Sequence, residues 1–135
     1  MKQGEALPRW EVVHRAILKR RWLDENGNIT AEAFLLRPND KQRLSTCRRD
    51  LKPWIECKEH FNRIHGGVSL RAGSIHSLGL NLKTIADPDL DRLEHASILG
   101  LPDPLEQPLL AERMASALRD IARRLPDEFW PSAVK

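Results

Sequence analysis

The stretch VSLRAGSIHSLGLNL, residues 68–82, decides the expected fold because it holds two short apolar runs with a turn signal between them. The first run is Val68 to Leu70, and in the second, residues 78–82, leucines alternate with small or polar residues. Alternation with a period of two is typical of a strand that buries one face. Gly73-Ser74 predicts the turn between the runs. We therefore expect two strands of one sheet here.

Two further segments extend this sheet. His95 to Leu99 is a short apolar run closed by Gly100, and Ile29 to Leu36 alternates apolar and polar side chains in its first half. Both patterns predict strands. The segment Leu44 to Arg49 stays ambiguous, because Ser45 or Thr46 also suits the cap of a short turn.

Three segments have the apolar spacing of amphipathic helices. Each begins at a proline, which the first turn of a helix accepts because its N–H would have no partner there. The first starts at Pro8, the second runs from Pro53 to near His65, and the third runs from Pro108 to just before Pro126. In the first, Trp10, Val13 and Ile17 recur at steps of three and four.

The order of these elements predicts an α+β fold, in which about three helices pack on a small, mainly antiparallel sheet. A chain of 135 residues is enough for one domain with a core of its own. We expect a single globular domain over residues 1–135, with a short flexible N-terminus (1–7) and a C-terminal tail (126–135).

Composition predicts a cytoplasmic protein. The chain is 41% hydrophobic and 30% charged, as in soluble globular domains. Its apolar runs are too short to span a membrane, and residues 1–7 lack the apolar core of a secretory signal. Two cysteines do not make the disulfide framework of a secreted domain, so we expect thiols in a reducing compartment.

The charge distribution favours a binding module for an anionic partner. The net charge is +3 and the isoelectric point about 9.1. Five cations crowd one short segment in which Asp50 is the single acid: Lys41, Arg43, Arg48, Arg49 and Lys52. Such a density predicts contact with nucleic acid or with an acidic protein.

The alternative is a small enzyme acting on a phosphodiester or nucleotide, with His95, His76 and Arg71 as its catalytic residues. Histidine titrates near neutrality and arginine clamps phosphate, and a wider cluster would add Arg37, Asp40 and Ser45. The spacing of Arg71 and His76 resembles that in helical ribonucleases of bacterial toxin and defence systems. His95-Ala-Ser resembles one His-x-Ser/Thr motif of the two-histidine phosphoesterases, a fold that uses two such motifs.

A metal centre is the weaker interpretation of four possible ligands. Zinc sites bring two cysteines within a few residues of each other, and this chain does not. The residues concerned are Cys47, Cys57, His60 and His65. We predict no metal and no cofactor. A third alternative is a structural protein that forms a homo-oligomer and binds no ligand, and the sequence leaves open whether the chain is an enzyme.

Overall fold

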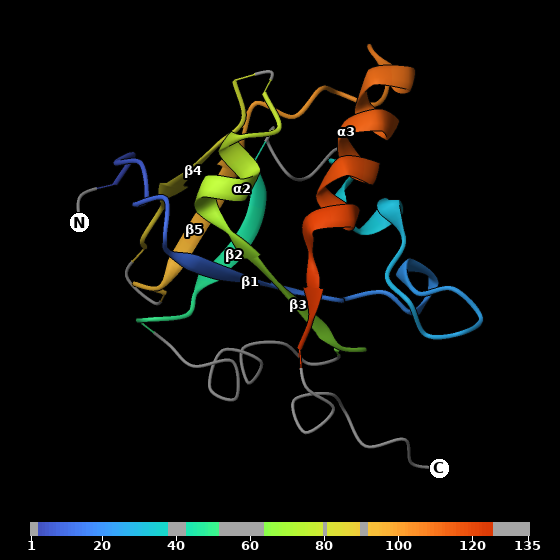
Figure 1. Cartoon of the computed structure of the whole chain (residues 1–135), viewed down its shortest axis with the longest axis horizontal. Coiled ribbons are helices and arrows are strands. Elements are labelled where there is room, and N and C mark those ends of the chain that lie inside the picture. Colours follow the sequence, from blue (N-terminus) through green and yellow to red (C-terminus); the bar gives the residue numbers. More distant parts are fainter. Residues whose placement is uncertain (1–2, 38–42, 52–63, 80, 90–91, 126–135) are drawn as a thin grey trace.

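The computed structural model describes residues 3–37, 43–51, 64–79, 81–89 and 92–125, which form one small α+β domain around a six-stranded sheet (Figure 1). The strand order is β4-β5-β2-β1-β3-β6, and every neighbouring pair is antiparallel. The strands are β1 (Val12–Ala16), β2 (Leu44–Arg48), β3 (Gly67–Arg71), β4 (Lys83–Ala86), β5 (His95–Leu99) and β6 (Arg123–Arg124).

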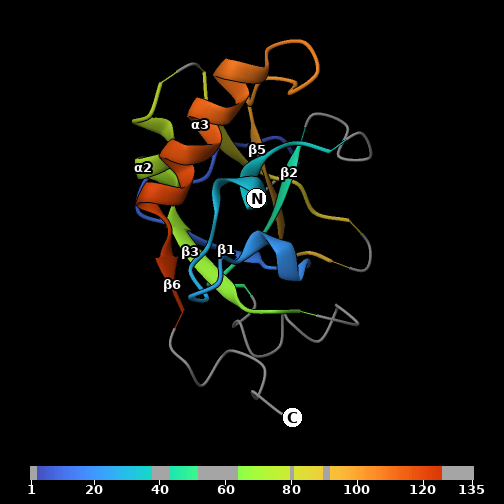
Figure 2. The ribbon, with the colours of Figure 1, turned by 90° about the vertical axis from the view of Figure 1, so that its right-hand side faces the viewer.

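Among the residues that the structure describes, one long helix covers this sheet, whereas we expected about three helices. α3 (Pro108–Ile121) begins at a proline as predicted, and α2 (Ala72–His76) is a single turn. Both lie on the same side of the sheet (Figure 2). Two 3-10 turns, η1 (Arg20–Trp22) and η2 (Ala31–Phe34), complete the described elements. The helix predicted from Pro53 falls mostly on residues outside the described part of the chain.

The first predicted helix is wrong, because its central residues form β1. Val13 and Ile17 are four residues apart, a spacing that fits one face of a helix and one face of a strand equally well. Arg15, between them, points into the same interior and is only 4% exposed. Because the charged Arg15 occupies an inward position, the sequence lacks the alternation of apolar and polar residues that would have predicted a strand. Pro8 begins a turn instead, in which the Glu11 N–H donates a hydrogen bond to the Pro8 carbonyl oxygen.

Two predicted strands are also wrong. Inside the expected strand 29–36, Ala31–Phe34 form the 3-10 turn η2, where the neighbouring side chains of Ala33 and Phe34 are both buried, as a strand with one buried face would not allow. The strand expected at 78–82 is replaced by β4 at Lys83–Ala86, directly after that range, because Gly79 and Asn81 adopt positive φ angles of 89° and 63°. The strands β3 and β5 and the helix α3 are confirmed, and the ambiguous segment from Leu44 is β2.

The core lies between the sheet and the helices. Alternate residues of the central strands, such as Val13, Leu70 and Ile98, face α2 and α3 there. The opposite side, which we call the second face, carries a smaller apolar cluster that includes Ala16 and Cys47. Residues 4–7 run along β4 and hydrogen-bond to it. In the described part of the chain, no helix is long and apolar enough to cross a membrane.

The cysteine prediction needs correction. The chain has two cysteines, and Cys47, buried on β2, is disulfide-bonded. The expectation of free thiols is therefore wrong. Because Cys47 is disulfide-bonded, the cysteines no longer support a reducing compartment. A cytoplasmic location stays a prediction.

A buried arginine ties the sheet to the segment that follows β1. Arg15 donates hydrogen bonds of 2.9 Å to the carbonyl oxygens of Ala33 and Ser45, and its guanidinium lies 5.3 Å from the ring centre of Trp22. Arg15 thus joins β1, β2, η1 and η2 at one point. Hydrogen bonds from a charged donor are stronger than neutral ones, and buried carbonyls that lose them stay unsatisfied.

We expect Arg15→Met to lower the free energy of unfolding by roughly 2–4 kcal/mol, because the buried carbonyl of Ala33 and the partly buried carbonyl of Ser45 lose a charged donor. Urea denaturation measures this. The control is Arg21→Met, since the Arg21 side chain is 66% exposed and its ion pair with Glu32 is weak. Equal stability of the two variants would show that Arg15 does not hold the fold together.

Candidate anion-binding site

Three arginines meet in a pocket of about 510 Å³ at one end of the sheet. Arg49 follows β2, Arg71 ends β3, and Arg123 begins β6. All three are exposed. The remaining lining comes from the strands and from the C-terminal end of α3: Val12, Ser69, Leu70, Ser74, Asp120, Ile121 and Ala122.

Strand register brings two of these arginines together. Val12 is paired with Arg71, and the N–H of Arg49 donates to the Val12 carbonyl oxygen at 3.1 Å. Residues opposite one another in neighbouring strands point to the same face of the sheet. Val13 faces the core, so Val12 and its two arginine neighbours belong to the second face.

A second row of paired residues supplies the third arginine. Ser69 is paired with Arg123 on one side and with His14 on the other. This row lies beside the row of Val12, again on the second face. The pocket therefore has three cations around a floor that contains Val12 and Ser69, and its geometry follows from backbone pairing alone.

The local charge balance is positive. Asp120 is the single acid among the lining residues, and it accepts a hydrogen bond of 3.1 Å from Arg119. Arg49 lies 3.4 Å from Asp50, but both side chains are about half exposed, so this ion pair is weak. Guanidinium groups gathered in a partly enclosed space attract an anion more strongly than the same groups spread over an open surface.

His14, next to Ser69 in the sheet, is 4% exposed. Burial lowers the pKa of His14 from its ordinary value of 6.5 to about 4, and the positive charge of Arg49 acts in the same direction. His14 is therefore neutral at pH 7. A neutral ring adds no charge of its own beside the three arginines.

The five residues of the predicted basic surface do not form one patch in the described part of the chain. Lys41 and Lys52 lie outside it. Arg48 is buried and forms a two-point ion pair with Glu11, with a distance of 2.8 Å from Nη2 to Oε1. Arg43 donates to Asp87 at 3.0 Å. Only Arg49 reaches the pocket.

The three predicted catalytic residues are not brought together either. Arg71 is in the pocket, but β3 and β5 are separated by two strands, which puts His95 about 14 Å away across the sheet. His76 lies at the end of α2 and is not among the residues that line the pocket. Nδ1 of each histidine pairs with a backbone carbonyl oxygen, that of Asp87 for His95 and that of Leu82 for His76. Of the wider cluster, Ser45 is exposed on β2, Arg37 lies beside Trp22, and Asp40 is outside the described residues.

His95 belongs to a different polar cluster, centred on Asp87. The carboxylate accepts hydrogen bonds from Ser97 at 2.7 Å, from Gln3 at 3.0 Å and from Arg43 at 3.0 Å. Burial raises the pKa of Asp87, but these hydrogen bonds and the charge of Arg43 outweigh it and hold the pKa below its usual range. The cluster ties the N-terminal segment and the start of β2 to β5, which is a structural role.

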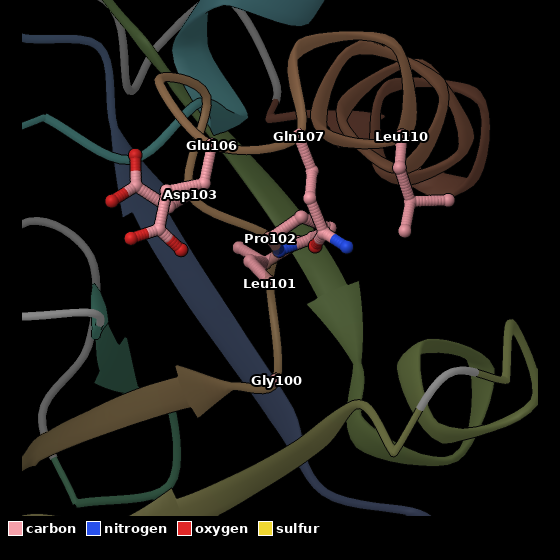
Figure 3. Close-up of a pocket in the computed structure, with 7 residues that line it drawn as sticks. All are labelled: Gly100, Leu101, Pro102, Asp103, Glu106, Gln107 and Leu110. Carbon is pink, nitrogen blue, oxygen red and sulfur yellow. The ribbon is translucent and has the colours of Figure 1, made fainter.

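A second pocket, of about 340 Å³, lies at the N-terminal end of α3 and has the opposite charge (Figure 3). The side chains of Asp103 and Glu106 lie on one side of it and those of Gln107 and Leu110 on the other. No cation is among its lining residues within the described part of the chain. Two carboxylates repel an anion, so of these two pockets the arginine pocket is the one that suits a phosphate.

The metal interpretation finds no support among the residues that the structure describes. Cys47 is disulfide-bonded and cannot act as a thiolate ligand, and Cys57 and His60 lie outside the described ranges. No group of three or more His, Cys, Asp or Glu side chains there could hold a metal ion.

Sequence reasoning missed Arg123 and Ser69. Arg123 was not among the predicted site residues, and it begins a strand that reaches the pocket. The signal that was present is the pair of basic residues at 123–124 directly after the last apolar position of the helix. Pairing partners, however, are not visible in one sequence. No protein-family model matches the chain, and the comparisons with curated proteins and with solved structures likewise give no match.

Because His14 takes up its proton at a lower pH in the folded protein than in the unfolded chain, acidification favours unfolding between pH 6.5 and about 4. We expect wild type to lose about 2–3 kcal/mol of unfolding free energy between pH 7 and pH 4.5, and His14→Gln to lose much less. Urea denaturation at the two pH values measures the difference. His65→Gln, at a half-buried position, is the control and keeps the wild-type change. An unchanged pH dependence in His14→Gln would rule out this origin.

Asp87 stabilises the fold in the ionised form, so its contribution is present at neutral pH and is lost as the pH falls below about 4. Asp87→Asn is expected to cost about 1–3 kcal/mol at pH 7 and to differ little from wild type at pH 2.5. Thermal unfolding at both pH values measures this, with the exposed Asp120→Asn as control. A cost that is the same at both pH values would contradict a role for the ionised carboxylate.

Proposed function

We propose that this protein binds an anionic, phosphate-bearing ligand, of which nucleic acid is one source, through the pocket of Arg49, Arg71 and Arg123. The observation that carries the proposal is that three arginines, from the turn after β2, from β3 and from β6, line one cavity. The hypothesis of a binding module for an anionic partner thus becomes a proposal about one specific site.

Phosphate suits this site better than a carboxylate does. A phosphate monoester or diester presents two or three oxygen atoms that accept hydrogen bonds, and a guanidinium can engage two of them at once. Three arginines arranged around one cavity offer more donors than a single carboxylate can accept. The hydroxyl groups of Ser69 and Ser74 line the same cavity and add neutral donors.

The ion pairs of the pocket arginines also support a function in binding an anion. No carboxylate holds Arg71 or Arg123 in an ion pair that the structure shows among its described residues, and Arg49 has only the weak contact with Asp50. Arg48, next to Arg49 in sequence, contrasts with them because Glu11 neutralises it inside the protein. Exposed cations in a cavity cost stability through mutual repulsion, and an anionic ligand would remove that cost.

The test is an NMR titration with inorganic phosphate and with a short single-stranded oligonucleotide. Each charge-assisted hydrogen bond contributes about 1.5–3 kcal/mol, so Arg71→Gln should weaken binding about tenfold or more. The triple change of Arg49, Arg71 and Arg123 to Gln should abolish it. Affinity should also fall steeply as salt rises from about 50 to 200 mM.

A matched control separates the pocket from general charge. Arg20, Arg21 and Arg113 are exposed and lie outside the pocket, and changing all three to Gln alters the net charge by the same amount. This control should bind as wild type does. If it weakens binding as much as the pocket variant, or if an acidic peptide binds as tightly as the oligonucleotide, the proposal fails.

A further inference from the structure

Trp10 stands out among the aromatic side chains that the structure describes. It is 61% exposed, whereas Trp22 and Phe34 are each about 1% exposed in the core. An indole on the surface leaves a large apolar area in water, and this one stands on the turn from Pro8 to Glu11. A role in binding would explain its position.

Hydrogen bonds place the backbone of Trp10 next to the arginine pocket. The residues on either side of it accept bonds of 2.8 Å from the segment after β3: the Ala72 N–H donates to Glu11, and the Gly73 N–H donates to Arg9. Ala72 and Gly73 are the two residues between Arg71 and Ser74, which both line the pocket. Trp10 also lies two residues before Val12 of the pocket floor.

Gly73 makes this close approach possible. A Cβ atom at position 73 would lie 2.8 Å from the carbonyl oxygen of Arg9, which is a clash with backbone. With glycine there, the turn that carries Trp10 packs directly against the segment leaving the pocket. These backbone contacts therefore hold the turn that carries Trp10 next to the segment that follows Arg71, although Trp10 itself is not among the residues that line the pocket.

We propose that the ligand of the arginine pocket is a nucleoside phosphate, free or within a single strand, whose base stacks on Trp10. This inference rests on the proposed function and names its ligand class. The cavity of about 510 Å³ lies in the range of small-molecule sites and exceeds the needs of a bare phosphate ion. Stacking on an aromatic ring tolerates any base, and an arginine beside the ring strengthens it.

The test compares three probes that share a phosphate: inorganic phosphate, ribose 5-phosphate and adenosine 5′-monophosphate. We expect the wild-type protein to bind the nucleotide about tenfold more tightly than ribose 5-phosphate, because stacking of one base adds binding free energy of this order. Trp10→Leu should remove this tenfold preference and leave the affinity for ribose 5-phosphate unchanged. Trp10→Phe should keep most of it, because the smaller ring still stacks. Calorimetric or NMR titration provides the dissociation constants.

Two failures are distinguishable. If ribose 5-phosphate and the nucleotide bind the wild-type protein equally, stacking is refuted while the phosphate site stands. If none of the three probes binds, the proposed function fails and this inference fails with it. A Leu105→Ala control, at a residue 86% exposed and remote from the pocket lining, should keep the wild-type preference. Loss of the preference there would also overturn the assignment to Trp10.

Discussion

The fold depends on a charged side chain placed inside it. Arg15 lies in the middle of the central strand β1, and its guanidinium reaches the carbonyls of Ala33 and Ser45 and the ring of Trp22. Burying a guanidinium costs several kcal/mol unless its donors find acceptors, so its partners must be ordered together with it. The described part of the segment between β1 and β2, which includes the 3-10 turns η1 and η2, is therefore held in place by hydrogen bonds from the strand before it.

Once β1 is fixed, the pocket follows from pairing. β2 and β3 flank β1, so the residues opposite Val12 on either side come to the same face, and both are arginines. β6 then adds Arg123 opposite Ser69. The three arginines of the pocket come from segments far apart in the chain and meet because antiparallel register places them in two adjacent rows. A shift of one residue in any of these strands would turn its arginine to the helix side.

Sequence reasoning predicted the α+β class, the strands β3 and β5 and the helix α3, where each residue pattern has a single interpretation. It failed where a polar residue points inward, as Arg15 does, because the pattern then fits a helix equally well. Arg49 was predicted as part of a basic surface because of the local density of charge. Arg71 was predicted as a catalytic residue because of its spacing to a histidine. The sequence therefore placed the two arginines in different sites. Their meeting depends on strand order, which local patterns do not contain.

The strongest simple explanation for the arginines is the dipole of α3, whose C-terminal end lines the pocket. Cations near a helix C-terminus gain about 0.3–1 kcal/mol each without any ligand, and the same dipole disfavours an anion there by a similar amount. This accounts for Arg123, which follows the helix directly. It does not account for Arg49 and Arg71, which the sheet supplies. Three charge-assisted hydrogen bonds of about 1.5–3 kcal/mol each exceed the opposition of the dipole, so the balance at this end of the sheet still favours a bound anion.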